Sequence, residues 1–330
     1  MIALLSSPIR KTQPKSEETV VEMKKLGSQG PEISVVGYGA WEAGGDFWGP
    51  NESDEVVIAA IQAALESGMN WIDTAEIYGK GRSEELVGKA VSGRREDVHL
   101  FTKVAPRPEG SGFRRDQVRE AIRASLRRLG TDHVDLYQLH WPDRSVPIEE
   151  TWGAMAELQD EGLTRHIGLS NVGRATVELC LDLRHVDSVQ NKLSLLHQDD
   201  RDDLLPSLAE WGVGYLAYSP LALGILTGGI TKDTRFHPQD FRGGARGAVP
   251  EHFKPAKLAA SLKRVEKLRP IAGRLGTTLA PLALRWVIEQ AGVTAAIAGS
   301  RKAEHVRNNS TSGDLRIDRQ TLEEIDRIFG

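Results

Sequence analysis

The alternation of short apolar segments with longer amphipathic segments constrains the fold of this chain more than any other feature of its sequence. The apolar segments are rich in β-branched residues and are short, which is typical of buried strands. The segments between them have helical periodicity, and several end at a glycine, as helices commonly do. The predicted strands are residues 33–39, 70–74, 98–103, 134–140, 166–170, 187–190, 212–219 and 293–299.

This alternation predicts parallel strands that are joined by helices. Two architectures fit it, an open doubly wound sheet and a closed (β/α)8 TIM barrel. Eight strand–helix units within 330 residues favour the barrel. The predicted helices are residues 54–67, 116–129, 149–161, 199–211 and 279–290.

The N-terminal part of the chain indicates two further features. Residues 21–37, "VEMKKLGSQGPEISVVG", predict a β-hairpin with Gly-Pro in its turn, which we expect to close the barrel floor. Pro, Ser, Lys and Glu dominate the segment before it, so residues 1–21 are predicted to form a mobile tail. Because no linker divides the rest, residues 22–330 are predicted to form a single catalytic barrel domain.

Composition excludes several classes of protein. The formal charge of −4 indicates no general attraction to nucleic acid or to an anionic membrane. The single cysteine, Cys180, excludes an intrachain disulfide and a multi-cysteine metal cluster. No apolar run approaches the roughly 18 residues that a membrane span needs. We therefore expect a cytoplasmic protein without a metal site, a membrane partner or a nucleic-acid partner.

Four reactive side chains occur where a barrel carries its chemistry, at the carboxyl ends of its strands. Asp73, Lys103 and His140 end three successive predicted strands, and Tyr78 follows Asp73 in the next loop. Each has an ordinary explanation when taken alone, as a loop anchor, a solvated charge or a structural histidine. Together, an ammonium group could stabilise a phenolate and lower the pKa of the phenol, while an imidazole could donate to a carbonyl oxygen. The set suits proton transfer to a developing alkoxide, whereas no activated nucleophile is apparent.

Other nucleotide and metal motifs are missing from the sequence. A Rossmann dehydrogenase requires G-x-G-x-x-G after its first strand. Residues 37–42, "GYGAWE", have Glu42 in the third glycine position. No P-loop and no H-E-x-x-H occurs either, which argues against a P-loop NTPase and a zinc hydrolase.

Six motifs in the expected order resemble those of the aldo-keto reductases: "DTAEIYGKGRSE", "FTKV", "DLYQLHWPD", "IGLSN", "YSPLALGILTG" and "AGSRKAEHVRNN". The resemblance extends from residue 22 to about residue 328. It implies a (β/α)8 barrel that reversibly reduces an aldehyde or ketone to the alcohol with NADPH. Asp73, Tyr78, Lys103 and His140 match the catalytic tetrad of the family, with Tyr78 as the proton donor. The implied partner is a small carbonyl or alcohol substrate.

The resemblance also implies a cofactor site. Ser170, Asn171 and Gln190 match groups that hold the nicotinamide carboxamide, and Tyr218 matches the aromatic residue that stacks on the ring. Arg301 matches a residue that holds the 2′-phosphate, which favours NADPH and leaves NADH possible. The implied cofactor residues are Gly39, Ala40, Trp41, Asp73, His140, Ser170, Asn171, Gln190, Tyr218, Ser219, Pro220, Leu221, Gly224, Leu226, Gly299, Ser300, Arg301, His305, Asn308 and Asn309.

Three of these residues depart from the family pattern. His305 stands where the family usually has Gln, Asn308 where it often has Glu, and Ala40 where Thr is common. The first two positions bear on the adenine end of the cofactor, and the third on the nicotinamide end. The substrate pocket is expected to be lined by Trp41, Tyr78 and Trp141.

A second function is compatible with the same motifs. Some members of this fold family are regulatory subunits of membrane channels that bind the cofactor and keep the tetrad, so the tetrad alone does not discriminate. Multiple turnover of a carbonyl would favour the enzyme. A stable complex with a channel and negligible turnover would favour the subunit.

Overall fold

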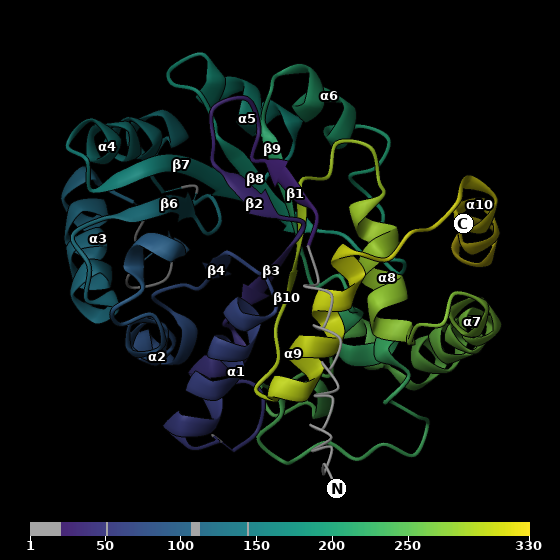
Figure 1. The fold of residues 1–330 in the computed structure, drawn as a ribbon. Helices are drawn as coiled ribbons and strands as arrows, with labels where there is room; N and C mark the ends of the chain where they lie inside the picture. Colours follow the sequence, from purple (N-terminus) through teal and green to yellow (C-terminus); the bar gives the residue numbers. More distant parts are fainter. Residues whose placement is uncertain (1–20, 51, 107–112, 144) are drawn as a thin grey trace, which may run out of the picture.

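Eight parallel strands form a closed barrel at the centre of the molecule (Figure 1). The computed structural model describes residues 21–50, 52–106, 113–143 and 145–330, so the predicted tail lies outside the described residues except for Val21. Strand β10 pairs with β3 and closes the ring, which confirms the predicted (β/α)8 barrel. The barrel strands are β3 (Val36–Gly39), β4 (Trp71–Asp73), β5 (His99–Val104), β6 (Val134–Leu139), β7 (Thr164–Ser170), β8 (Ser188–Lys192), β9 (Gly214–Tyr218) and β10 (Ala295–Ala298).

Helices surround the barrel, and four of the five predicted helices begin and end within two residues of their predicted bounds. Ser53 caps the first helix by accepting the backbone N–H of Val56, and the third helix ends at Gly130 in the left-handed conformation (φ 68°). None of the helices in the described ranges is long and apolar enough to cross a membrane. The helices are α1 (Asp54–Glu66), α2 (Arg82–Ala90), α3 (Arg115–Leu129), α4 (Ile148–Asp160), α5 (Arg174–Leu181), α6 (Leu204–Glu210), α7 (Pro255–Arg274), α8 (Leu279–Ile288), α9 (Ala303–Ser310) and α10 (Arg319–Phe329).

Two predicted elements differ from the structure by more than two residues at one end. The predicted helix 199–211 is shorter, because α6 begins only at Leu204. Pro206 is tolerated in a first turn, but its ring would clash with the carbonyl group of residue 202 if the helix extended further back. The predicted strand 33–39 is divided, and its first residues belong to the hairpin strand β2 (Glu32–Ser34).

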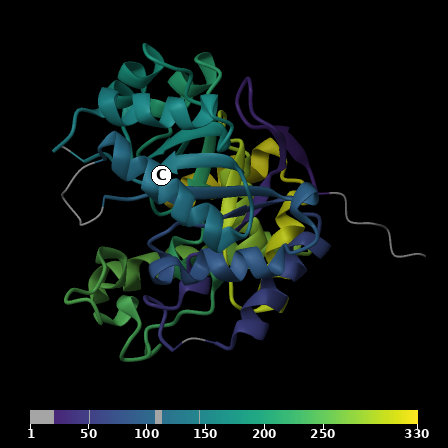
Figure 2. The ribbon, with the colours of Figure 1, turned by 90° about the vertical axis from the view of Figure 1, so that its left-hand side faces the viewer.

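The predicted hairpin closes one end of the barrel. Strand β1 (Met23–Lys25) pairs antiparallel with β2. Leu26, which follows β1, and Ile33, which lies within β2, are fully buried. Both side chains pack inside the barrel at its hairpin end, with Trp71, Phe101, Leu136, Leu216, Ala295 and Ile297. In Figure 2 the hairpin lies on the opposite side of the molecule from the long green loop after β9. The hairpin therefore forms the apolar floor that the sequence predicts.

The barrel interior has two layers. The apolar layer next to the hairpin is called the lower layer, and the polar layer next to the carboxyl ends of the strands is called the upper layer. Side chains alternate along a strand, so residues two apart share the inner face. Trp71, Phe101 and Leu136 of the lower layer are therefore followed, two residues later, by inward polar side chains. The buried upper-layer residues are Asp73, Lys103, Gln138 and Gln190. Electrostatic interactions in this layer are strengthened because the floor beneath them excludes water.

Two loops cover the carboxyl ends of the strands. We call residues 40–50 the first loop and residues 219–254 the long loop. A backbone bridge joins Trp48 to Asp240, and the N–H of Phe241 donates to the carbonyl oxygen of Phe47 at 2.9 Å. The two loops thus form one connected cover on the side of the barrel that faces away from the floor.

Candidate active site

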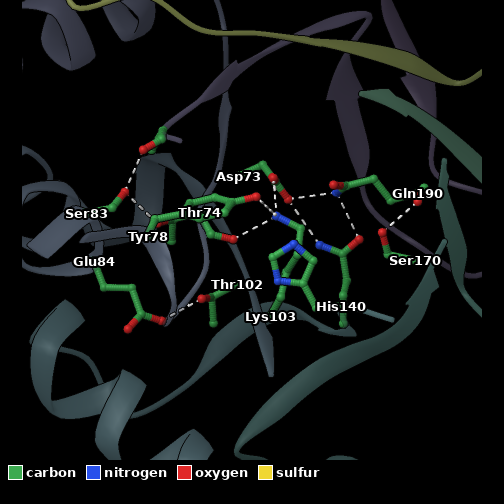
Figure 3. A network of polar contacts seen from close by, with 12 residues as sticks. Asp73, Thr74, Tyr78, Ser83, Glu84, Thr102, Lys103, His140, Ser170 and Gln190 are labelled. Atoms are coloured by element: carbon green, nitrogen blue, oxygen red, sulfur yellow. Dashed lines mark hydrogen bonds and ion pairs between the residues drawn. The ribbon is translucent and has the colours of Figure 1, made fainter. Parts of the chain in front are cut away.

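The structure brings together the four reactive side chains that the sequence singles out (Figure 3). Asp73 ends β4, Lys103 lies in β5, His140 follows β6, and Tyr78 begins the turn η2 (Tyr78–Gly81). The Nζ of Lys103 donates to Asp73 Oδ1, to the Thr74 carbonyl oxygen at 2.8 Å and to the Tyr78 hydroxyl at 3.4 Å. The rings of Tyr78 and His140 meet edge to face, with their centroids 5.6 Å apart.

Burial and the neighbouring charges together determine the protonation of these groups. It raises the pKa of Tyr78, and the Lys103 ammonium offsets only part of that effect, so the ammonium does not produce the low pKa that its proximity alone suggests. Burial acts to lower the pKa of Lys103, but attraction to Asp73 and Tyr78 outweighs it and the pKa is raised. Burial, with Lys103 nearby, holds the pKa of His140 well below 6.5. At neutral pH the set is a neutral phenol, an ammonium and a neutral imidazole.

The second oxygen of Asp73 is held by two glutamine amides. Asp73 Oδ2 accepts from Gln190 Nε2 at 2.8 Å and from Gln138 Nε2 at 3.1 Å. Gln190 Nε2 also donates to Gln138 Oε1 at 3.1 Å. Gln138 was not among the site residues predicted from the sequence. Its signal was a polar residue inside an apolar strand, two residues before His140 and therefore on the same face.

The backbone around Tyr78 explains the glycines that follow it. Gly79, Lys80 and Gly81 all have positive φ (60°, 56° and 99°), which glycine adopts without strain. A Cβ atom on Gly79 would lie 2.3 Å from the carbonyl oxygen of Gly44 in the first loop. A close backbone contact between two loops therefore fixes the position of Tyr78.

A cavity of about 850 Å³ lies beneath the two loops. Tyr78 and His140 lie at one part of its wall, and Arg301 and Asn309 at another. Among the described residues, Ala40 and Leu226 are buried away from this cavity, and Lys103 lies below its wall. The predicted residues that line it are Gly39, Trp41, Asp73, Tyr78, His140, Trp141, Ser170, Asn171, Gln190, Tyr218, Ser219, Pro220, Leu221, Gly224, Gly299, Ser300, Arg301, His305, Asn308 and Asn309.

A polar network surrounds the part of the cavity next to His140. Asn171 has positive φ (57°), and its Nδ2 donates to the His140 carbonyl oxygen at 2.9 Å and to Ser170 Oγ at 3.1 Å. The hydroxyl of Tyr218 donates to Asn171 Oδ1 at 2.7 Å. Burial raises the pKa of Tyr218 to about 12, so this hydroxyl keeps its proton. The ring of Tyr218 is thus tethered at the cavity wall.

Arg301 connects the far part of the cavity to the first loop. Its guanidinium donates to the carbonyl oxygens of Pro50 at 2.7 Å and Trp48 at 3.1 Å. Glu42, which the sequence analysis did not select as a site residue, lies near Arg301 and Arg242. Burial raises the pKa of Glu42 to about 6, although both cations oppose the effect. The carboxyl group is therefore mostly ionised at neutral pH and becomes protonated as the pH falls through about 6.

Aromatic rings flank the tyrosine and the histidine. The ring centroid of Trp41 lies 6.3 Å from that of Tyr78, and the ring of Trp141 lies 4.6 Å from His140. The ring centroid of Trp41 also lies 5.0 to 5.7 Å from those of Phe47 and Trp48 in the first loop and of Phe241 in the long loop. The sequence analysis did not anticipate these last three contacts. This part of the cavity suits an apolar group beside a carbonyl.

The barrel and this arrangement of side chains are typical of an oxidoreductase that depends on NAD(P)H, and the comparisons with known proteins show this class. The Aldo/keto reductase family model matches residues 35–329, nearly the whole chain, and the chain belongs to this family. An aldo-keto reductase of Bacillus subtilis is 37% identical over 289 residues, which cover 86% of each chain. The NADH-specific methylglyoxal reductase of Escherichia coli is 33% identical over 316 residues, or 89% of this chain and 95% of that protein.

Solved structures have the same fold. The glycerol dehydrogenase of Gluconobacter oxydans superimposes with a TM-score of 0.81 at 28% identity and covers 95% of both chains. An aldo-keto reductase of Klebsiella pneumoniae, solved in complex with NADPH, superimposes with a TM-score of 0.74 at 29% identity. That match covers 94% of this chain and 95% of the other.

Proposed function

We propose that this chain reversibly reduces an aldehyde or ketone to the alcohol with NADPH, and that Tyr78 is the proton donor. The observation that carries the proposal is the position of the Tyr78 hydroxyl, on the cavity wall and 3.4 Å from the buried Lys103 ammonium. A general acid must hold its proton at the working pH and must be stabilised after losing it. Burial meets the first need, and the ammonium meets the second.

Each of the other residues has a separate role in this proposal. Asp73 keeps Lys103 charged and in place, because it accepts a hydrogen bond from the ammonium. His140 is neutral and can donate a hydrogen bond to the substrate carbonyl oxygen. As negative charge develops on that oxygen, Tyr78 transfers its proton to it, and Lys103 stabilises the resulting phenolate. In the reverse direction the phenolate accepts the proton of the alcohol.

The described residues fit a nicotinamide dinucleotide. The cavity is large, and its wall carries amide and hydroxyl groups together with the Arg301 guanidinium. When bound, the reduced cofactor supplies the hydride. We propose that Ser170, Asn171 and Gln190 hold the carboxamide, that Tyr218 stacks on the ring, and that Arg301 holds the 2′-phosphate. The Klebsiella pneumoniae structure with NADPH supports this choice, and the NADH-specific Escherichia coli relative supports NADH as a second cofactor.

The substrate pocket is proposed to lie between Trp41 and Trp141. These rings flank Tyr78 and His140, so an apolar substituent could pack against them while the carbonyl oxygen faces the phenol and the imidazole. This arrangement supports carbonyl compounds that carry an apolar group next to the reacting carbon.

Tyr78→Phe tests the proton-donor role. The substitution keeps the ring and removes the hydroxyl, so we expect turnover to fall by a factor of about 10² to 10⁴, while the cofactor binds with nearly unchanged affinity. Turnover is followed by the absorbance of the reduced nicotinamide with a panel of carbonyls and alcohols. Tyr215→Phe is the matched control, because that buried hydroxyl donates to Asp200 outside the cavity. Near-normal turnover of Tyr78→Phe would show that the assignment is wrong.

A further inference from the structure

We propose that Gln138 is a positioning residue for proton transfer, which holds the carboxylate of Asp73 and the amide of Gln190 in one fixed arrangement. This inference rests on the proposed function, because it concerns how the proton donor is tuned. Gln138 is fully buried in β6 and does not line the cavity, so it acts through its neighbours rather than on a ligand.

The donors and acceptors around Asp73 permit one arrangement of the two amides. An ionised carboxylate can only accept, so Gln138 and Gln190 must both turn their Nε2 atoms toward Asp73 Oδ2. The second N–H of Gln190 then meets Gln138 Oε1 at 3.1 Å. With both of its N–H groups engaged, Gln190 presents Oε1 as its free hydrogen-bonding atom on the cavity wall. Gln138 therefore takes part in deciding which atom of Gln190 a bound ligand meets.

The same contacts connect Gln138 to the tyrosine. Asp73 Oδ2 receives the two amide donors, while Oδ1 receives the Lys103 ammonium, which also lies 3.4 Å from the Tyr78 hydroxyl. If the Gln138 donor is lost, the carboxylate has fewer hydrogen bonds and attracts the ammonium more strongly. The ammonium then stabilises the Tyr78 phenolate less well, so the pKa of Tyr78 rises.

A residue that only filled space would behave differently. Methionine has nearly the volume of glutamine but makes no comparable hydrogen bond, so Gln138→Met preserves packing and removes both polar contacts. If Gln138 served only packing, this substitution would leave the acid–base behaviour of Tyr78 unchanged. The titration of Tyr78 is therefore the measurement that separates the two roles.

The experiment compares the wild type with Gln138→Met in the full-length chain. The first readout is the tyrosinate absorption of the protein without cofactor, with Tyr78→Phe subtracted to isolate Tyr78. The second is the pH dependence of kcat for alcohol oxidation, which requires the phenolate. We expect both midpoints to rise by about one pH unit and kcat at neutral pH to fall about tenfold, while KM for the alcohol changes less than about twofold.

Two further variants complete the test. Gln159→Met makes the same chemical change at an exposed amide of α4 that donates to the Arg165 carbonyl oxygen, and should leave both midpoints unchanged. Gln138→Glu decides the question if Gln138→Met does not fold. Its acid form can donate to Asp73 and its ionised form cannot, so kcat for reduction should approach that of the wild type at low pH and fall steeply as the pH rises.

Two outcomes would overturn the positioning role. One is an unchanged Tyr78 midpoint in Gln138→Met, even if kcat falls, and the other is a wild-type pH profile in Gln138→Glu. Failure of the proposed function has a different signature, because Tyr78→Phe would then keep normal turnover or the wild type would reduce no carbonyl.

Discussion

Arg301 lines the cavity and also holds the first loop through hydrogen bonds. Two of its five N–H groups donate to the carbonyl oxygens of Trp48 and Pro50, which leaves three for another acceptor. Glu42 lies close by, and its pKa of about 6 means that it carries negative charge at neutral pH. A 2′-phosphate would therefore meet both an attractive guanidinium and a repulsive carboxylate. With Arg301 in its proposed role, the balance of the two would set how strongly NADPH is preferred to NADH.

Arg301→Ala tests this balance at the level of the residue. Loss of a charge-assisted contact of about 1.5–3 kcal/mol should weaken NADPH binding at least tenfold, whereas NADH, which lacks the phosphate, should lose about twofold or less. Dissociation constants of both cofactors would be measured by quenching of protein fluorescence. Arg316→Ala, which removes an exposed arginine paired with Glu22, is the control. Equal losses for NADPH and NADH would contradict the 2′-phosphate role.

The first loop and the turn η2 act together as structural elements. Gly44 and Gly79 touch through their backbones, and the aromatic residues of the first loop pack against Phe241 of the long loop. The position of Tyr78 therefore depends on the first loop, although helix α1 and strand β4 lie between them in the chain. The arrangement of the two loops and the position of Tyr78 are therefore coupled.

Gly44→Ala tests the contact between these elements. The added Cβ would lie 2.6 Å from the Gly79 nitrogen and the Tyr78 carbonyl carbon, so the turn must shift. Because small displacements of a reacting group are costly, we expect kcat to fall by about 10- to 100-fold. Gly153→Ala is the matched control, since its Cβ meets no atom within 4 Å, and it should keep normal kcat. Normal turnover of Gly44→Ala would show that the contact does not position Tyr78.

The sequence predicted those features that depend on local pattern. Asp73, Lys103 and His140 could be placed together, because the carboxyl ends of parallel strands meet at one rim of a barrel. The contacts of Phe47, Trp48 and Phe241 could not, since no periodicity specifies which residues of two irregular loops meet. Gln138 was overlooked because a single polar residue in a strand does not reveal its partners. Helix α7 is one of several helices that were not predicted, and Pro270 in its interior interrupts the helical pattern.

At the scale of the whole molecule, the reactive side chains lie in a different layer of the barrel from many of the apolar side chains that stabilise the fold. The hairpin and the lower interior form an apolar floor, with Leu26 and Ile33 fully buried. The polar layer with Asp73 and Lys103 lies above it. Changes in the floor should therefore affect the free energy of unfolding more than the properties of the folded enzyme.

Ile33→Ala tests this separation. Removing a fully buried isoleucine side chain should lower the free energy of unfolding by about 2–5 kcal/mol, because it loses apolar burial and leaves a cavity. The kcat of the folded fraction should stay within about twofold of the wild type. Urea denaturation and steady-state kinetics would measure the two quantities. A loss of kcat with unchanged stability would contradict the division into floor and polar layer.

The hairpin floor also affects the order in which the cofactor and the substrate can bind and leave. Ser170 and Gln190, proposed to hold the nicotinamide, are almost fully buried, whereas Trp41 and Trp141 nearer the mouth are partly exposed. With the hairpin across the other end, a seated carbonyl compound would cover the nicotinamide ring. If the dinucleotide binds as proposed, it would bind before the carbonyl compound and leave after the alcohol, and its release would limit turnover when the two loops separate slowly.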